Sequence, residues 1–395
     1  MLPIGRLRFV SDTAAPPRQQ WTAQWADLVG EVIQAGLCTG CAGCVISCPR
    51  GVLELDTDSW QPVLGGDAGE AGECVHGLGG CTMCTRACPR LRAWETDADV
   101  ALHGRHRTVD EVIGIHRAIK LVTATDPAIR AAGQDGGFAT AAMLYALEHH
   151  LIDAALVSGV DDDLNTYPVL ATDRDTLVGA AGSRYTYSAT TLAYREGIEA
   201  GHRRMGLVSV GCQASIPAVA GARGARKLRN RLSLVIGLLC CETFVDSVYE
   251  DLLEAGHGVS RAQVGWTNIK GKFQVFPVGA EPGAPPSLEV PLPDCAPYKR
   301  PGCEHCPDFT AQHADISVGG IGSRPKTTVA IVRTDAGEQL RAAMEADGWV
   351  TVEDAEVEDP KAVALIRRLA VRQRSQWTAA GDAATARPEP GLVPG

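Results

Sequence analysis

The chain has 395 residues, of which 45% are hydrophobic, and a formal net charge of −10. This length and apolar content allow one large core with a smaller appended domain, which excludes a fibre or a disordered chain, and the acidic balance argues against nucleic acid as the principal partner. There is no run of about twenty apolar residues, and residues 1–30 lack a secretory pattern, so we expect a cytoplasmic protein without a membrane span.

Residues 1–30 are interpreted as an N-terminal extension, in which a polar start is followed by helical spacing from Trp21 to Val32. The next segment, 31–95, carries eight of the 14 cysteines. They form two runs, Cys38-x₂-Cys41-x₂-Cys44-x₃-Cys48-Pro49 and Cys74-x₆-Cys81-x₂-Cys84-x₃-Cys88-Pro89. This spacing is typical of bacterial-type ferredoxins. CxxC pairs also bind zinc, but the paired Cys-Pro endings favour iron–sulfur clusters, and a reducing cytoplasm keeps the thiols free.

The two runs predict two 4Fe-4S clusters that exchange their fourth ligands, because in two-cluster ferredoxins the fourth cysteine of a run binds the other cluster. The predicted ligands of one cluster are Cys38, Cys41, Cys44 and Cys88. Those of the other are Cys74, Cys81, Cys84 and Cys48. The second run is irregular, since Leu78 stands where its first cysteine is expected. Cys74 is the nearest substitute, and the glycine-rich residues 77–80 would bend back to place it.

A polar stretch over 95–107 is predicted to be a linker, after which strands and helices alternate as in an α/β fold. The predicted fold class is therefore mixed α/β, with a ferredoxin-like unit fused to a larger domain that has a mixed central sheet. The expected strands are 112–115, 121–122, 154–160, 206–210, 232–239, 315–318 and 328–332, with an antiparallel hairpin of 272–278 and 288–292. The expected helices are 137–150, 175–181, 190–203, 216–223, 336–346 and 361–374, followed by a flexible tail over 376–395.

Six cysteines lie in the larger domain, namely Cys212, Cys240, Cys241, Cys295, Cys303 and Cys306. An isolated buried cysteine is often only a small hydrophobic residue. Cys303 and Cys306, however, lie in a loop rich in Gly, Pro and Asp, and Cys212 and Cys240 each follow a predicted strand. Strands that run in parallel would bring those two to one edge of the sheet, where a cluster could be bound. Spacing alone does not choose between Cys240 and Cys241.

A series of ordered motifs in the larger domain resembles the family of coenzyme F420 hydrogenase/dehydrogenase beta subunits. The motifs are Gly133-Gln134-Asp135-Gly136-Gly137, Ala181-Gly182-Ser183-Arg184-Tyr185-Thr186-Tyr187, Gly211-Cys212-Gln213, Ile236-Gly237-Leu238-Leu239-Cys240, Lys270-Gly271-Lys272-Phe273, Cys303-Glu304-His305-Cys306-Pro307-Asp308, and two stretches over 314–322 and 332–337. The resemblance covers roughly 111–375. With the ferredoxin-type unit in front, the chain is most similar to the input subunits of reduced-F420 dehydrogenases.

This resemblance implies that residues 108–375 bind FAD, coenzyme F420 as substrate, and a third 4Fe-4S cluster. Carried onto this chain, the cluster ligands are Cys212, Cys240, Cys303 and Cys306, which leaves Cys241 and Cys295 as non-ligands. The family usually has proline where this chain has Gly211. The implied activity is hydride exchange between F420 and FAD, with single electrons passed through the clusters to or from a redox partner, either ferredoxin or a larger respiratory or oxidoreductase complex.

The predicted contacts of the flavin and the deazaflavin are Gln134, Asp135, Gly136, Gly137, Thr140, Gly182, Arg184, Tyr185, Thr186, Lys270 and Lys272. The two adjacent glycines would open a helix and allow close approach of a phosphate or a ring. Arg184, where the family often has lysine, would place a cation beside the flavin or clamp a phosphate. The two lysines would bind a diphosphate or the acidic tail of F420, although paired lysines are also common at a solvated sheet edge.

A basic run, Arg223 to Arg231, would steer the anionic deazaflavin or lie on a solvent-facing helix end. Neither a Walker A sequence nor a Gly-x-Gly-x-x-Gly after the first strand of the larger domain is present, which argues against NAD. Three alternatives stay open: a ferredoxin-dependent reductase of an organic substrate, like the chlorophyll-modifying relatives; a ferredoxin:deazaflavin oxidoreductase; and a wiring subunit without catalysis.

Overall fold

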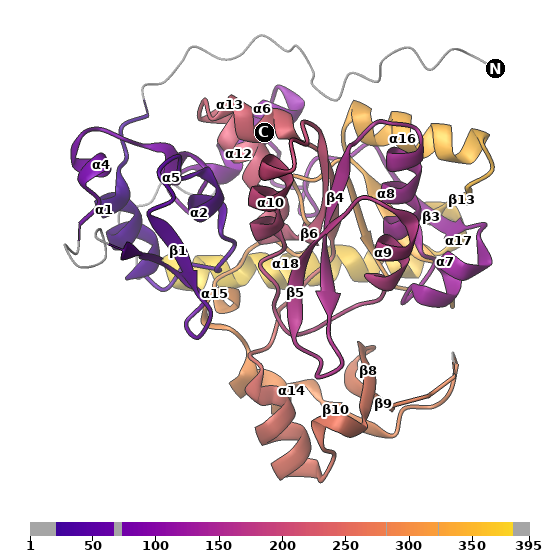
Figure 1. Ribbon diagram of the computed structural model, residues 1–395. Helices are drawn as coiled ribbons and strands as arrows, with labels where there is room; N and C mark the ends of the chain where they lie inside the picture. The colour runs from indigo at the N-terminus through magenta and orange to yellow at the C-terminus, as the bar shows by residue number, and fades with distance from the viewer. Residues whose placement is uncertain (1–20, 67–72, 282, 323, 382–395) are drawn as a thin grey trace.

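A computed structural model describes residues 21–66, 73–281, 283–322 and 324–381 (Figure 1). The first twenty residues of the predicted N-terminal extension and residues 382–395 of the predicted tail lie outside the described residues. Within the described part, no helix is both long and apolar enough to cross a membrane.

An eight-stranded mixed sheet forms the centre of the molecule, in the order β13-β3-β12-β11-β7-β6-β4-β5. The strands β11, β7, β6 and β4 run parallel, whereas the pairings at both ends of the sheet are antiparallel. Short apolar runs form the parallel strands because both faces are covered. The bounds are β3 (Ala118–Ala124), β4 (Ala154–Val160), β5 (Thr166–Ala171), β6 (Met205–Val210), β7 (Leu232–Leu238), β11 (Ile316–Gly319), β12 (Thr328–Val332) and β13 (Val350–Asp354).

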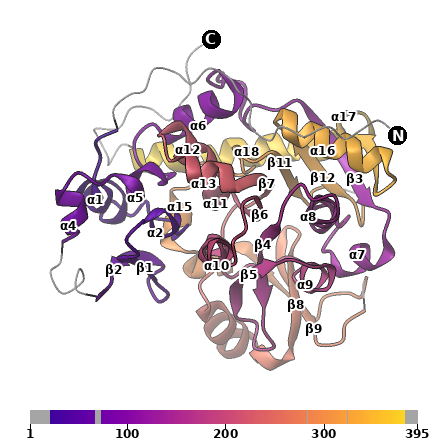
Figure 2. The ribbon, with the colours of Figure 1, turned by 45° about the horizontal axis from the view of Figure 1, so that its top comes forward.

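Helices cover both faces of this sheet (Figure 2). One face packs against α8 (Phe138–Glu148), α9 (Arg174–Gly179) and α16 (Asp335–Ala346), through buried residues such as Phe138, Leu177 and Leu340. The other face packs against α17 (Ala355–Glu358) and the long α18 (Pro360–Gly381). On the first face lies also α7 (Pro127–Ala132), whose Ile129 joins the same cluster. The other helices of this domain are α10 (Ala193–Glu199), α11 (Gly211–Ala214), α12 (Ile216–Ala222) and α13 (Arg226–Arg231), with η2 (Thr190–Leu192) before α10.

A three-stranded antiparallel sheet, in the order β10-β9-β8, lies below the central sheet in Figure 1. It has its own apolar core, which includes Phe244, Phe273 and Cys295. Its strands are β8 (Val264–Ile269), β9 (Lys272–Pro277) and β10 (Leu288–Pro291), accompanied by η3 (Val248–Ala255), η4 (Arg261–Gln263), α14 (Leu292–Cys295), η5 (Ala296–Tyr298) and α15 (Pro301–Glu304). The predicted hairpin of 272–278 and 288–292 is thereby confirmed.

The cysteine-rich N-terminal unit packs beside the central sheet, at the left of Figure 1. It contains α1 (Trp25–Leu28), η1 (Val29–Ile33), α2 (Gly43–Ser47), β1 (Leu53–Asp56), β2 (Gln61–Leu64), α4 (Val75–Leu78) and α5 (Met83–Arg86). Buried residues of this unit, among them Cys41 and Leu91, share one apolar cluster with Ile216 and Ala220 of α12. The unit is therefore joined to the larger domain by a common core.

Several sequence expectations are corrected by the structure. The stretch 95–107, predicted to be a linker, is mostly α6 (Trp94–His103), and its charged residues Glu95, Asp99 and Arg107 are buried. The polar composition suggested a solvent-exposed segment, but these charges neutralise one another inside the protein. The predicted strand 112–115 is a turn. The tail predicted from residue 376 is still helical as far as Gly381, because α18 continues to that residue.

Candidate functional site

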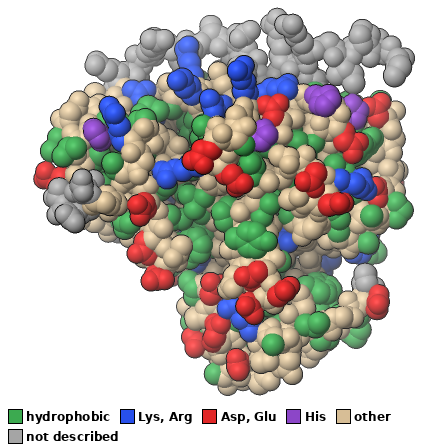
Figure 3. All heavy atoms as spheres, in the orientation of Figure 1, with side chains coloured by type: hydrophobic (Ala, Val, Ile, Leu, Met, Phe, Trp, Pro, Cys, Tyr) green, Lys and Arg blue, Asp and Glu red, His purple; other side chains and the backbone are tan. Residues whose placement is uncertain are grey.

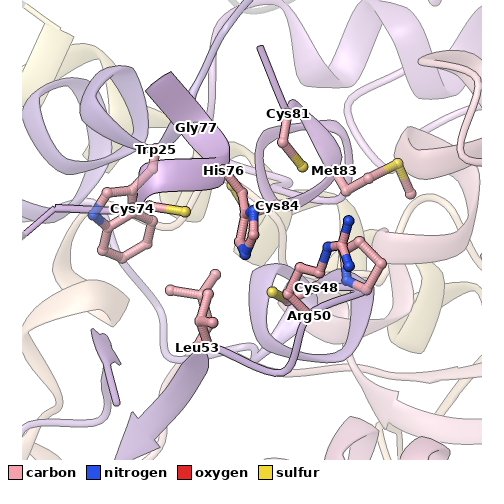
Figure 4. Close-up of a pocket in the computed structure, with 12 residues that line it drawn as sticks. Trp25, Cys48, Arg50, Leu53, Cys74, His76, Gly77, Cys81, Met83 and Cys84 are labelled. Carbon is pink, nitrogen blue, oxygen red and sulfur yellow. The ribbon is translucent and has the colours of Figure 1, made fainter. Parts of the chain in front are cut away.

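Two cavities in the N-terminal unit divide the eight cysteines as the ligand exchange predicts. The first cavity is lined by Cys38, Cys41, Cys44 and Cys88, together with Arg90. The second is lined by Cys48, Cys74, Cys81 and Cys84, and the thiols labelled in Figure 4 turn toward a common space beside His76. The two cavities are similar in size.

Local backbone geometry places the cysteines around these cavities. Ala42, just before α2, is left-handed with φ 56°, and this turn lets α2 carry Cys44 toward the first cavity. Cys74 caps the short helix α4, after which Gly80 reverses the chain with φ 89°. A positive φ costs glycine little, so the irregular insert brings Cys74 to the same cavity as Cys81.

Both cavities disfavour isolated thiolates. Burial raises the pKa of Cys41 to about 11 and of Cys84 to about 12, and neighbouring thiols add to both shifts. Four thiols around one enclosed space therefore need positive charge if they are to act as thiolates, and a cluster of iron ions supplies it. The donor set fits such a cluster. Among the described residues, no three His, Cys, Asp or Glu side chains are grouped to hold a single metal ion.

A third set of thiols gathers at the edge of the central sheet. Cys212 lies in α11 directly after β6, and Cys240 follows the neighbouring parallel strand β7, with Val210 and Leu238 in register. Cys303 lies in α15 and Cys306 follows it. Burial raises the pKa of Cys240, and Cys303 and Cys212 add to this shift.

The two remaining cysteines lie apart from this set in different ways. Cys241 is solvent-exposed, whereas Cys240 is only partly exposed. Cys295 is buried in the core of the small sheet, where its thiol faces the carbonyl of Pro291 at 3.7 Å. The arrangement thus supports Cys240 as the ligand and a packing role for Cys295.

Residues that the sequence did not single out lie between the third thiol set and the first cavity. The Nη2 of Arg90 donates to the Sγ of Cys306 at 3.0 Å. The Arg300 guanidinium stacks 3.6 Å from the ring centroid of Tyr187 and donates to the carbonyl of Thr39 at 3.0 Å. Thr191 donates to the carbonyl of Cys41 at 2.7 Å. Only tertiary structure brings these side chains together; Arg90 has one sequence signal, its position after Cys88-Pro89.

The glycines predicted to bind cofactor begin α8. Gly137 is the N-cap with φ 76°. Gly136 lies against the sheet, where an added Cβ would meet the Val122 carbonyl oxygen at 2.5 Å and the Thr328 amide nitrogen at 2.7 Å. The predicted helix opening is confirmed, and Gly136 is required by this close backbone approach.

Several predicted contacts gather near that helix start. Asp135 pairs with Lys270, Oδ1 to Nζ 3.7 Å, and Gln134 accepts from the Ser183 amide at 3.4 Å. The Tyr185 hydroxyl accepts from the Ile269 amide at 3.0 Å. Burial raises the pKa of Asp135, while Lys270 and Lys326 oppose that shift. The sequence analysis missed Lys326, and it missed Gly320, whose missing side chain leaves room for the Asp135 carboxylate.

Other predicted contacts have different partners. Lys272 pairs with Glu289 across the β9–β10 hairpin at 2.8 Å, so its ammonium is not shared with Asp135. Arg184 donates to the carbonyls of Ala180 and Gly182 at 2.7 and 2.8 Å. Thr140 lies in the first turn of α8, and Thr186 is buried in an isolated bridge to Phe244.

The basic run around α13 has two parts. Arg226 and Lys227 are exposed, and Figure 3 shows a gathering of Lys and Arg side chains at the top of the view, over α13. Arg223 is buried instead and donates to the carbonyls of Cys88 and Leu91 in the N-terminal unit. Steering of an anion by Arg223 is therefore excluded, because its charge does not face solvent.

Comparison with known proteins assigns the chain to a family. Residues 120–194 match the N-terminal part, and 202–358 the C-terminal part, of the family described as "Coenzyme F420 hydrogenase/dehydrogenase, beta subunit". A curated relative, the coenzyme F420 hydrogenase subunit beta of Methanosarcina barkeri, is 31% identical over 268 residues, which are 66% of this chain and 89% of that protein. The chain belongs to the family of coenzyme F420 hydrogenase/dehydrogenase beta subunits. The predicted family is confirmed.

Two further similar proteins support this family assignment. A component of the F420H2 dehydrogenase of Methanosarcina mazei is 28% identical and covers 79% of this chain and 83% of that protein. A solved structure of the F420-reducing [NiFe] hydrogenase complex from Methanosarcina barkeri matches with a TM-score of 0.64 and 29% identity, over 72% of this chain and 97% of that one. The predicted mixed α/β fold class is confirmed, and the family is one of F420-linked oxidoreductases.

Proposed function

We propose that this beta-subunit homologue exchanges hydride between coenzyme F420 and a bound FAD and passes single electrons through three 4Fe-4S clusters to or from a redox partner. F420 and FAD exchange two electrons as hydride, and the clusters carry electrons singly. The proposed partner is ferredoxin or a larger redox complex, since relatives of this chain are named as subunits of a hydrogenase and a dehydrogenase.

The observation that carries the proposal is the spatial order of the three thiol sets. Arg90 lines the first cavity and its Nη2 donates to the Sγ of Cys306 in the third set at 3.0 Å, so these two sets are adjacent. Next to the first cavity, the Ser47 hydroxyl donates to the carbonyls of Cys44 and of Met83, and Met83 lines the second cavity. Cys48, Cys74 and Cys81 of the second cavity are partly exposed. The first cavity thus lies between the other two sets, which have partly exposed thiols, and this order suits an electron path from the third set through the first cavity to the second.

The flavin would be held beside the sheet by the residues at the start of α8. Gly137 caps this helix with a positive φ, and Lys270 and Lys326 surround Asp135 with positive charge. Tyr185 lies between this region and the thiols: burial raises the pKa of its hydroxyl, and Asp135 and Cys240 add to the shift. Hydride transfer requires two rings held in place with water excluded, and the partly buried Tyr185 ring, edge-on to the buried Phe273, supports such a site.

Anaerobically purified protein tests this function. We expect about twelve irons and one FAD per chain, and rapid bleaching of the flavin absorbance by reduced F420 but not by NADH. Bleaching by reduced F420 followed by reduction of the clusters would support the path. A loaded flavoprotein that reduced F420 cannot bleach would refute it.

One relative favours a second candidate, a reductase. The coenzyme F420-dependent sulfite reductase of Methanocaldococcus jannaschii is 28% identical over 83% of this chain, although the chain spans only 49% of that protein. In the ferredoxin-dependent form of this alternative, electrons enter through the second cavity and the flavin reduces a further substrate. Flavin bleaching by reduced ferredoxin alone would identify it.

A further inference from the structure

One buried cation contacts both the first cavity and the third thiol set. Arg90 is 2% exposed. It lines the cavity of Cys38, Cys41, Cys44 and Cys88, and its Nη2 donates to the Sγ of Cys306 at 3.0 Å. Arg90 therefore lies at the junction between two of the proposed clusters, where an electron must cross from the larger domain to the N-terminal unit.

Surrounding groups hold the guanidinium in place. Nη1 donates to the Pro89 carbonyl at 2.6 Å, and the guanidinium carbon lies 4.7 Å from the ring centroid of the buried Trp94. The buried Nε has no hydrogen-bond partner within the described residues. An arginine side chain stays protonated in proteins, so Arg90 is a permanent positive charge in hydrogen-bond contact with the thiol of a proposed cluster ligand.

We propose that Arg90 is a positioning residue that raises the electron affinity of the third cluster through its hydrogen bond to Cys306. This inference rests on the proposed function. Each electron accepted at the third thiol set adds one negative charge, which a buried cation 3.0 Å from a ligand sulfur stabilises, since hydrogen bonds to the sulfurs and local charge set cluster potentials. Each electron lost there is gained at the first cavity, and Arg90 stays protonated, so no proton moves.

A purely structural role is the competing explanation. An anchor at the junction would change stability or iron content when removed, but it would leave the reduction potential of a fully loaded cluster unchanged. The reduction potential is therefore the measurement that separates the two roles.

The experiment is an EPR-monitored redox titration of the full chain with all clusters loaded. The variants are Arg90→Gln and Arg90→Lys. Arg92→Gln is the matched control, because Arg92 is two residues away but partly exposed and paired with Glu31 and Asp27. A Cys303→Ser variant assigns the signal of the third cluster.

We expect Arg90→Gln to lower the one-electron reduction constant of the third cluster about tenfold, which is about 59 mV. The first cluster should shift less. Arg90→Lys, which keeps the charge but loses the planar fork, should lower the constant by about threefold, and Arg92→Gln should leave it unchanged. If Arg90→Gln loses iron, the change in the reduction potential of the third cluster in Arg90→Lys is the result that tests the inference.

Unshifted potentials in fully loaded Arg90 variants would overturn this inference alone, with the proposed function intact. If Arg90→Gln does not load its clusters, an unshifted reduction potential in fully loaded Arg90→Lys would overturn the inference. Wild-type protein that holds only about eight irons, with no third cluster, would overturn the proposed function and this inference with it.

Discussion

At the scale of single residues, Cys74 decides whether the second cavity can hold a cluster. It is the irregular member of its run, yet its thiol lines the same cavity as Cys48, Cys81 and Cys84. A serine hydroxyl is a much poorer iron ligand than a thiolate. We therefore expect Cys74→Ser to lower the iron content from about twelve to about eight per chain, measured on anaerobically purified protein.

Cys241→Ser is the control for this substitution. Cys241 is exposed, and the contact from Gln373 goes to its backbone carbonyl, which serine keeps. Its iron content should equal that of the wild type. Full iron retention by Cys74→Ser would show that the second cluster has another ligand.

At the scale of elements, α6 is held by a network of buried charges. Arg107 pairs with Asp99 at 2.6 Å and Arg374 of α18 pairs with Glu95 at 2.9 Å, while His313 contacts Asp99 at 3.3 Å. Removal of one partner leaves the other charges buried without compensation. We expect Glu95→Gln to lower the free energy of unfolding by about 3 kcal/mol, measured by anaerobic chemical denaturation.

The pH dependence of this effect follows from the pKa of Glu95. Burial would raise it, but Arg374 and Arg107 lower it to about 2 from an unfolded value of 4.5. A carboxyl group whose pKa is lowered on folding stabilises the protein at pH values above its unfolded pKa. This contribution is lost as the pH falls toward 2. The difference in the free energy of unfolding between wild type and Glu95→Gln should thus be the same at pH 7 and pH 5.

Glu338→Gln is the matched surface control. Glu338 pairs with Arg341 within α16, and its side chain is 39% exposed. Exposed pairs contribute up to about 1 kcal/mol, so this variant should differ little from the wild type. An equal effect of both substitutions would contradict the role of burial in α6.

At the scale of the whole molecule, Arg223 joins the two parts of the chain. Directly after α12, it pairs with Asp97 of α6 at 2.8 Å and donates to the carbonyls of Thr85, Cys88 and Leu91. We expect Arg223→Gln to lower the free energy of unfolding by about 3 kcal/mol and to release iron from the N-terminal unit first. The cluster absorbance, recorded during denaturation, measures this release. Arg226→Gln, an exposed neighbour, should unfold like the wild type.

The sequence predicted much of this arrangement, for physical reasons that can be named. Thiol spacing along the chain determines which cysteines can surround a cluster, and short apolar runs mark strands covered on both faces. The edge strands were harder to predict. β5, β8 and β13 are only five or six residues long and bury one or two residues each, so they lack the apolar run that marks a central strand.

By itself, the sequence determined the family, the mixed α/β class and the grouping of cysteines, because these follow from residue types at fixed spacings. Only the tertiary structure decided that 95–107 is mostly a helix with buried charges at Glu95, Asp99 and Arg107, that Arg223 faces the protein interior, and that Arg90 lies between two thiol sets. Burial and charge pairing arise when segments far apart in the chain meet. Arg90 and Cys306 are separated by 216 positions, and no local pattern encodes their contact.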